Sequence, residues 1–426
     1  MKKRLLTLRY GKSKVEVKIP EENLVYTVGP KDLPGLRDEK KSIKESLNNP
    51  IQSAPLYQEV KKGMKVVIIG DDITRPTPRE RIFSPLLDEL NEAGIPDRDI
   101  KVLIALGTHR YMSKEEIEVC FGKGITERVK VLNHEWQDKT NLVRIGSAPT
   151  GTPIEVNKIA YEADYLIGVG SIVPHSLAGY GGGAKIVQPG ICSWETTGKT
   201  HLLPVERDDF LSYVGNPENR VRLEMEEVAR IVGLDFIVNV VLNVKEEIVD
   251  VVSGDPIKAH RKGVEVARRV YERKIPELAD IIIISAYPAE IDYWQGIKPL
   301  SYAQHGLKKG GIVILLASFP DGISPTHFVG FERYADRSYG EIKGLVKKDK
   351  IEDLVCASTL LQHVLIRNRC EVICISEGLS IKQKEKLGLR HADGVEEALE
   401  VALAEYGKRA KIGVIDYGGD VLPRLS

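Results

Sequence analysis

Short apolar segments alternate with amphipathic segments along the first two thirds of the chain. The predicted strands are residues 66–70, 102–106, 129–132, 165–170 and 235–243. Helices are predicted over residues 79–93, from a capping box at Ser113–Glu116 onward, and over 218–232. Ahead of them we expect a hairpin of residues 5–9 and 15–19 and a charged surface helix at 36–48. This alternation is typical of a mostly parallel α/β sheet.

A second, shorter alternation begins after Pro276. It predicts strands at 280–286, 311–317, 371–375 and 411–415, helices at 299–308 and 393–406, and a long irregular section between residues 317 and 371. A chain of 426 residues is longer than a single core usually supports. We therefore expect two α/β domains with mostly parallel sheets, an N-terminal domain of residues 1–270 and a smaller C-terminal domain of residues 271–426.

Composition excludes several classes of partner. Lys+Arg and Asp+Glu both number 61, and aromatic residues make up 6%, which speaks against binding to nucleic acid. The longest apolar runs are of strand length, too short to span a membrane. The five cysteines form no Cys-x-x-Cys pair, and residues 1–9 lack an apolar signal-peptide segment, so a reducing cytoplasm is expected.

A glycine-rich segment, residues 175–190, follows the predicted strand 165–170. His175 opens it, four glycines fall within residues 179–183, and Lys185 follows. The spacing fits neither a P-loop nor a dinucleotide-binding fingerprint, although backbone N–H groups of such a loop can cradle a phosphate. A flexible surface turn with a solvated lysine is the alternative. A lysine desolvated here would lose pKa and become a nucleophile able to hold a cofactor covalently.

Three histidines lie in or beside glycine- and threonine-rich segments: His109, His175 and His201. Two neutral imidazoles at the ends of neighbouring strands can act as base and acid on opposite faces of one carbon, which suits racemisation. An isolated histidine is more often structural. His201 alone is a poor metal site, and Thr200 beside it is a candidate helix cap.

Polar residues also follow two other predicted strands. Asp71 and Asp72 are candidates for a divalent metal site or for helix capping before residue 79, and Arg75 is suited to clamp a carboxylate or phosphate. Within residues 293–298, Trp294 is a candidate pocket wall, with Gln295 and Lys298 as donors; the alternative is a surface turn with an anchored tryptophan. Ligands bind at the carboxyl ends of parallel strands, so we expect these segments to meet in an interdomain cleft.

Together these segments resemble the nickel-pincer lactate racemase family. The matching motifs are Asp-Asp-x-Thr-Arg-Pro (71–76), Gly-Thr-His-Arg (107–110), Pro-His-Ser-x-Ala-Gly-x-Gly-Gly-Gly-Ala-Lys (174–185), Gly-Lys-Thr-His (198–201) and Gln-Gly-x-Lys (295–298). They occur in order over most of the chain, and the glycine–lysine motif is long and specific.

The resemblance implies a cofactor, a reaction and site residues. Lys185 would carry a Ni(II) pyridinium-3,5-bisthiocarboxylic acid mononucleotide through a thioamide bond, and His201 would complete the planar metal site. His109 and His175 match the acid/base pair. The remaining implied contacts are Arg75, Gln295, Lys298 and Trp294 for substrate, and Asp72, Thr74, Gly182 and Gly183 for cofactor.

The implied reaction is racemisation of a 2-hydroxy acid, most readily lactate, by reversible hydride transfer to the cofactor through a 2-oxo acid. Proteins that make and insert the cofactor would be partners, and the resemblance is compatible with a homo-oligomer. Trp294 departs from the family, whose lactate-specific members carry a smaller tyrosine there. Alternatives are therefore a racemase or C2 epimerase of a longer 2-hydroxy acid or aldonate, and a non-catalytic protein that binds anionic metabolites.

Overall fold

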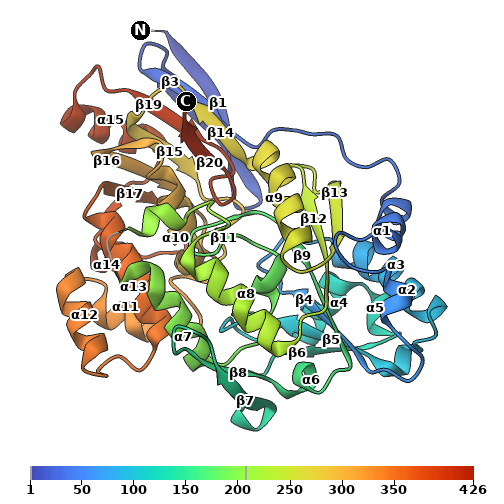
Figure 1. The fold of residues 1–426 in the computed structure, drawn as a ribbon. Helices are drawn as coiled ribbons and strands as arrows, with labels where there is room; N and C mark the ends of the chain where they lie inside the picture. The colour runs from blue at the N-terminus through green and yellow to red at the C-terminus, as the bar shows by residue number, and fades with distance from the viewer. Residues whose placement is uncertain (1, 207–208) are drawn as a thin grey trace.

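Two six-stranded sheets form the centre of the computed structural model, which describes residues 2–206 and 209–426 (Figure 1). The first sheet has the order β13-β12-β9-β4-β5-β6, and its strands are parallel except for β13. Their bounds are β4 (Val66–Asp71), β5 (Ile100–Ala105), β6 (Lys130–Asn133), β9 (Tyr165–Ser171), β12 (Phe236–Leu242) and β13 (Ile248–Gly254). The mixed α/β architecture with mostly parallel sheets is confirmed.

Helices cover both faces of this sheet. Residues of α1 and α3 pack in one core cluster, and residues of α8 and α9 pack in another on the opposite face. The helices of this half are α1 (Glu39–Asn48), α2 (Leu56–Glu59), α3 (Arg79–Glu92), α4 (Lys114–Phe121), α5 (Lys123–Thr126), α6 (Lys158–Tyr161), α7 (Trp194–Leu202), α8 (Arg220–Val232) and α9 (Lys258–Tyr271). Two short hairpins accompany them, β7 (Leu142–Ser147) with β8 (Pro153–Asn157) and β10 (Pro174–His175) with β11 (Gly179–Tyr180).

The second sheet is entirely parallel, in the order β18-β17-β16-β15-β19-β3. Its strands are β3 (Leu24–Val28), β15 (Ala279–Ser285), β16 (Leu307–Leu316), β17 (Glu371–Ile375), β18 (Arg390–His391) and β19 (Ile412–Ile415). The residues of β15 are buried throughout, as expected for a strand covered on both faces. One face carries α10 (Tyr293–Ala303) and α13 (Leu354–Arg367); the other carries α15 (Val395–Tyr406) and the hairpin β1 (Lys3–Tyr10)–β2 (Ser13–Pro20).

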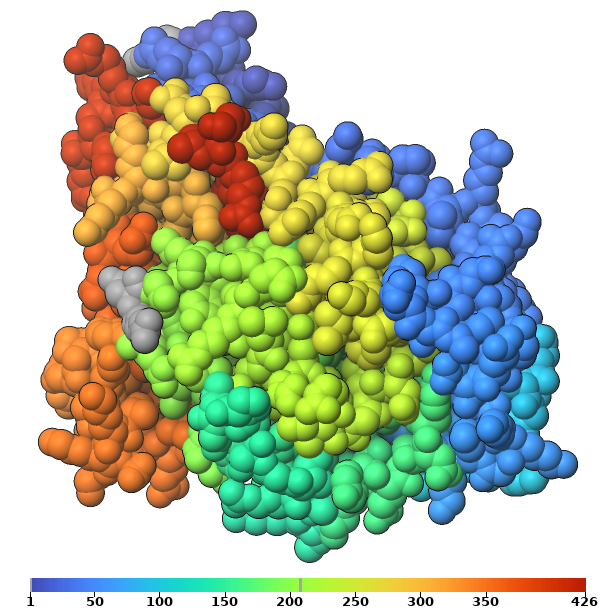
Figure 2. Space-filling model, in the orientation of Figure 1, coloured from blue at the N-terminus to red at the C-terminus, as the bar shows by residue number. Residues whose placement is uncertain are grey.

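The N-terminal residues thus lie with the second sheet. The strand β3 pairs with β19, and the apolar side of the β1–β2 hairpin packs on that sheet's core. In Figures 1 and 2 the dark red β20 (Leu422–Leu425) lies beside the yellow β14 (Glu272–Ile275), a parallel pair that ties the C-terminus to the middle of the chain. The division into domains 1–270 and 271–426 stays a prediction.

Two predictions about the second half were wrong. The helix expected at 299–308 begins at Tyr293, because Asp292 caps it by accepting a hydrogen bond from the backbone N–H of Gln295, and Pro299 is accommodated inside it. The section between residues 317 and 371 is not irregular. It contains α11 (Phe328–Tyr334), α12 (Tyr339–Lys347) and α13, and α14 (Ile381–Lys386) follows β17.

The helix α13 explains why that section was misread. Residues 355–366 are all buried, including the polar residues Ser358, Thr359, Gln362 and His363, so the helix has no solvent-exposed charged face to mark it in the sequence. Among the described helices, none is long and apolar enough to cross a membrane.

Candidate active site

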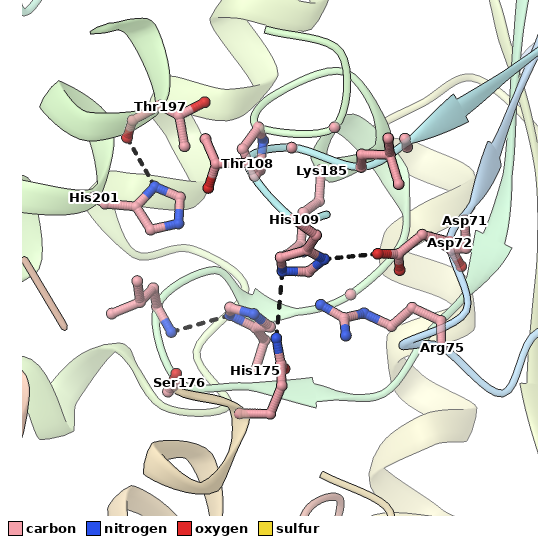
Figure 3. A pocket seen from close by; sticks show the side chains of 18 of the residues that line it. Asp71, Asp72, Arg75, Thr108, His109, His175, Ser176, Lys185, Thr197 and His201 are labelled. Carbon is pink, nitrogen blue, oxygen red and sulfur yellow. Dashed lines mark hydrogen bonds and ion pairs between the residues drawn. The ribbon is translucent and has the colours of Figure 1, made fainter. Parts of the chain in front are cut away.

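The segments that carry the candidate site residues meet in one cavity that is lined from both halves of the chain. Figure 3 shows His109, His175, Arg75, Lys185 and His201 around this space. The predicted site residues that line it are Asp72, Arg75, His109, His175, Gly182, Lys185, His201, Trp294, Gln295 and Lys298. Thr74 and Gly183 do not line it.

His109 follows β5 and is oriented from two sides. Its Nδ1 lies 2.6 Å from Oδ2 of Asp72, a residue that is 3% exposed. Its Nε2 lies 3.3 Å from Nε2 of Gln295 (Figure 3). Burial lowers the pKa of His109, while the Asp72 carboxylate opposes that shift. Burial alone would raise the pKa of Asp72, but the neighbouring His109 and Arg75 lower it overall. His109 is therefore neutral, with its proton on Nδ1 and an unprotonated Nε2 facing the cavity.

His175 is held in the opposite tautomer. Its Nδ1 accepts hydrogen bonds from the backbone N–H groups of Leu177 and Ala178, both at 3.2 Å. Burial, followed by the positive charges of Lys185, Lys298 and others, lowers the pKa of His175 well below its usual value. The neutral ring therefore carries its proton on Nε2. The cavity is lined by one histidine that accepts at Nε2 and one that donates there.

The glycine-rich segment is not a flexible surface turn. Residues 171–184 are buried, and Arg222 of α8 binds the carbonyl oxygens of Ala178, Tyr180 and Gly182 from behind. Arg222 is itself fully buried, and burial lowers its pKa to about 10.

Two further side chains brace this loop. Nε2 of His260 donates to the carbonyl of Gly181 at 2.9 Å, and Oδ1 of Asn239 accepts from the N–H of Gly183 at 2.7 Å. Gly183 has φ +57°, and a Cβ there would lie 2.8 Å from the His260 ring, so only glycine fits. The sequence held no signal for Arg222, His260 or Asn239, because each lies within an ordinary helix or strand.

Lys185 lies in the short 3-10 helix Gly183–Ile186, with its side chain at the cavity. Burial, with the positive charge of Arg75 as the next cause, lowers its pKa to about 7. Among residues 2–206 and 209–426, no hydrogen bond or ion pair engages its amine. A substantial fraction of this lysine is therefore a neutral, nucleophilic amine near neutral pH.

His201 presents a free nitrogen to the same cavity. Its Nδ1 donates to the carbonyl of Thr197 at 2.8 Å, which leaves Nε2 unprotonated, and burial lowers its pKa to about 4. Thr200 is not the helix cap: Ser193 caps α7 by accepting from the N–H of Thr196, and Thr200 lies inside the helix. The described part of the chain contains no group of three His, Cys, Asp or Glu able to hold a metal, so Asp71 and Asp72 do not form a metal site by themselves.

The same cavity is lined by Arg75 and by residues of α10. The helix α10 places Trp294, Gln295 and Lys298 at the cavity within its first turns, so residues 293–298 are not a surface turn. Burial, then the charges of Arg75 and Lys185, lowers the pKa of Lys298 well below its usual value. Arg75 donates to the hydroxyl of Thr74 at 2.9 Å and forms no ion pair within the described residues, so its charge is available to an anion.

Two buried hydroxyl groups at the cavity lack partners within the described part of the chain. Ser171 is 2% exposed and Thr197 is 1% exposed, and neither Oγ of Ser171 nor Oγ1 of Thr197 has a hydrogen-bond partner there. An unsatisfied buried hydroxyl costs free energy unless a bound molecule completes it. Sequence reasoning missed both residues, because serine and threonine in a strand or helix are unremarkable.

Comparison with known proteins agrees with this arrangement. The model of the lactate racemase N-terminal domain matches residues 10–210, and that of the lactate racemase C-terminal domain matches residues 275–422. The lactate racemase of Thermoanaerobacterium thermosaccharolyticum is 29% identical over 98% of this chain and 99% of its own length. That of Lactiplantibacillus plantarum is 30% identical over 90% of this chain and 91% of its own.

Solved structures show the same fold. The lactate racemase apoprotein from T. thermosaccharolyticum superposes with a TM-score of 0.88 at 28% identity, covering 99% of this chain and 100% of that one. A protein from Thermotoga maritima matches with a TM-score of 0.73 at 21% identity, over 91% of this chain and 98% of its own, which supports the fold alone. The chain therefore belongs to the lactate racemase family, and is an isomerase of the racemase class.

Proposed function

We propose that this protein racemises a 2-hydroxy acid, with lactate as the first candidate, in the cavity between the two sheets. The pair of neutral histidines carries the proposal. His109 presents a base at Nε2 and His175 presents an N–H donor, both at the same cavity. When the C2 hydrogen leaves as a hydride, the hydroxyl proton must leave as well and later return to the same oxygen, which such a pair can manage.

The substrate carboxylate is assigned to the cationic side of the cavity. Arg75 offers a guanidinium without an ion pair among the described residues, and Lys298 donates to Oε1 of Gln295 beside it. A planar guanidinium binds a carboxylate through two parallel hydrogen bonds. Trp294 borders this end of the cavity and would limit the side chain on the substrate's C2 carbon.

We further propose that Lys185 carries the nickel pincer nucleotide and that Nε2 of His201 binds its metal. The lysine amine has no partner in the described chain, and the lone histidine would need a bound group to supply the other metal ligands. The unpartnered hydroxyls of Ser171 and Thr197 fit the polar edge of such a group. When bound, the cofactor would supply a hydride acceptor for the C2 hydrogen.

The predicted cofactor contacts of Asp72, Thr74 and Gly183 stay predictions. Asp72 already orients His109, and the Thr74 hydroxyl donates to Oδ1 of Asp72 at 2.6 Å. Gly182 lines the cavity, and a Cβ there would lie 2.6 Å from Oδ1 of Asn239, so the close packing of its backbone excludes a side chain. A cytoplasmic location, dependence on proteins that make and insert the cofactor, and assembly into a homo-oligomer belong to the same proposal.

The chain's own residues then act in a simple order. Arg75, Lys298 and Gln295 hold the carboxylate while Nε2 of His109 takes the hydroxyl proton. Asp72 stabilises the resulting imidazolium through the Nδ1–H bond, as a carboxylate does for a catalytic histidine elsewhere. His175 donates its Nε2–H to the substrate oxygen from the other side. Return of the proton to that oxygen, after the carbon has presented its other face, leaves the opposite enantiomer.

Co-expression with cofactor-making proteins tests this function. Intact mass and peptide mapping should place an adduct on Lys185, and chiral chromatography should show that pure L-lactate becomes a mixture of enantiomers. Lys185→Arg should lose both, whereas Lys199→Arg, at an exposed lysine that pairs with Glu195, should lose neither. A loaded wild-type protein that racemises neither lactate nor longer 2-hydroxy acids and aldonates would refute the proposal.

A further inference from the structure

All three tryptophans of the chain lie in one row of aromatic rings that includes His327. Trp136 and Trp194, from the first half, have ring centroids 4.9 Å apart, and Trp194 lies 5.1 Å from His327. His327 in turn stacks on Trp294 with centroids 4.0 Å apart and an interplanar angle of 18°. The row therefore crosses from the first half of the chain to the cavity wall in the second.

His327 is held in place by polar contacts at both ring nitrogens. Its side chain is 1% exposed, and Nδ1 lies 2.7 Å from Oδ2 of Asp353. The other oxygen of Asp353 caps α13 by accepting from the N–H of Cys356 at 2.8 Å, so the carboxylate cannot turn away freely. Since the carboxylate only accepts, Nδ1 carries the proton and Nε2 accepts from the hydroxyl of Thr108 at 3.4 Å.

These contacts join His327 to the neighbours of two site residues. Thr108 immediately precedes His109, and Trp294 immediately precedes Gln295, whose amide contacts Nε2 of His109. At the far end of the row, Nε1 of Trp136 donates to the carbonyl of His109 at 2.9 Å. His327 thus connects the backbone around the proposed base to the indole at the substrate end of the cavity.

An indole wall selects substrates only if it cannot move aside. Trp294 is half-buried: part of the indole packs against the core of the second half, and the rest lies outside that core. Among the described residues, the ring contacts on it are the face-to-face stack with His327 and an edge contact with Phe331 at 6.0 Å. Losing the imidazole would leave a space beside the indole into which it can swing.

We propose that His327 is a positioning residue that fixes Trp294 as the cavity wall and thereby restricts the length of the substrate side chain. The inference rests on the proposed function for its substrate class, because the side chain in question is that of a 2-hydroxy acid. It assigns no proton transfer to His327.

The first test uses tryptophan fluorescence of the apoprotein and needs no activity. His327→Ala should increase quenching by acrylamide, and the increase should vanish in a Trp294→Phe background if Trp294 is the ring released. His327→Phe keeps the stack and should stay near wild type, and His327→Asn keeps a polar group without a ring and should resemble alanine. The matched control is His391→Ala, which removes another histidine paired with an aspartate, far from the tryptophans in sequence.

The second test measures kcat and KM of the loaded enzyme with lactate and with 2-hydroxybutyrate. One methylene group changes discrimination by roughly tenfold, so His327→Ala should raise the kcat/KM ratio of 2-hydroxybutyrate to lactate by about that factor. His327→Phe should restore the wild-type ratio. A purely structural role would lower both kcat/KM values together and leave their ratio unchanged.

The two tests distinguish failure of the positioning role of His327 from failure of the proposed racemase function. If the loaded wild type racemises no 2-hydroxy acid, the function fails, and quenching alone then decides whether His327 holds Trp294. Unchanged quenching in both His327→Ala and His327→Asn would overturn the positioning role, whatever the activity. So would a substrate ratio that stays at the wild-type value in His327→Ala.

Discussion

The two halves of the cavity hold their functional groups by different means. In the first half, backbone hydrogen bonds set the side chains: Leu177 and Ala178 fix the ring of His175, and Arg222 fixes three carbonyls of the glycine-rich loop. In the second half, α10 presents Gln295 and Lys298, whose contacts are mainly with other side chains. The proposed acid and base lie, together with Arg75, on the half braced by the backbone, which we call the rigid half. The proposed contacts of Gln295 and Lys298 come from the other, the adjustable half.

The largest effect is expected at the proposed base on the rigid half. His109→Asn removes the acceptor at Nε2, and general base catalysis contributes roughly 100- to 10,000-fold, so kcat for lactate should fall by that order. The measurement is the initial rate of racemisation from each pure enantiomer. His391→Asn is the control, and retention of more than about a tenth of the wild-type kcat by His109→Asn would remove His109 from the mechanism.

Arg222→Met tests whether the rigid half depends on buried backbone contacts. The change leaves the carbonyls of Ala178, Tyr180 and Gly182 without this donor, and each unsatisfied buried group costs about 1–3 kcal/mol. We expect the free energy of unfolding to fall by about 3 kcal/mol or more, measured by urea denaturation. Arg220→Met, at an exposed position of the same helix, should change it by about 0.5 kcal/mol at most. An equal loss of unfolding free energy in the two variants would show that the buried contacts of Arg222 do not support the rigid half.

Lys298→Met is the counterpart on the adjustable half. A hydrogen bond to a charged group contributes about 1.5–3 kcal/mol, so kcat/KM should fall roughly 10- to 100-fold, mainly through KM. Stability should stay equal or rise, because a desolvated amine, whose pKa burial lowers well below its usual value, is replaced by an apolar chain. Steady-state kinetics and urea denaturation of the same preparation check both parts. A large loss of stability would show that Lys298 supports the fold as well.

The smallest change is a shift in reactivity rather than a loss. The pKa of Lys185 is lowered to about 7, so its amine is protonated and inert below that pH and becomes nucleophilic as pH rises through it. In the apoprotein, an amine-reactive reagent should label Lys185 half-maximally near pH 7, as followed by peptide mass spectrometry. Half-maximal labelling only near about pH 10, the ordinary value for a lysine amine, would contradict a desolvated amine.

Local patterns were sufficient for most of the fold. Strands such as residues 66–70 and 165–170, and the capping box at Ser113–Glu116, were correctly predicted, since the spacing of apolar residues reports directly on strands and helices. The helix α13 was missed because burial on all sides leaves it without the charged, solvent-exposed face that marks a surface helix. The pairing of β3 with β19 lies beyond such patterns, because nothing local links strands almost 400 residues apart.

The candidate site divides in the same way, into what local sequence patterns indicate and what only long-range contacts decide. By itself, the sequence singled out the candidate residues, since motifs that resemble those of the family include His109, His175, Lys185, Arg75 and His201. Only the tertiary structure decided their states. The fold brings the Asp72 carboxylate to Nδ1 of His109 and two backbone N–H groups to Nδ1 of His175. It also brings Arg222 to the carbonyls of the glycine-rich loop, and His327 to the ring of Trp294. A tautomer, a lowered pKa or a fixed wall depends on groups brought together from distant parts of the chain, and packing alone brings them together.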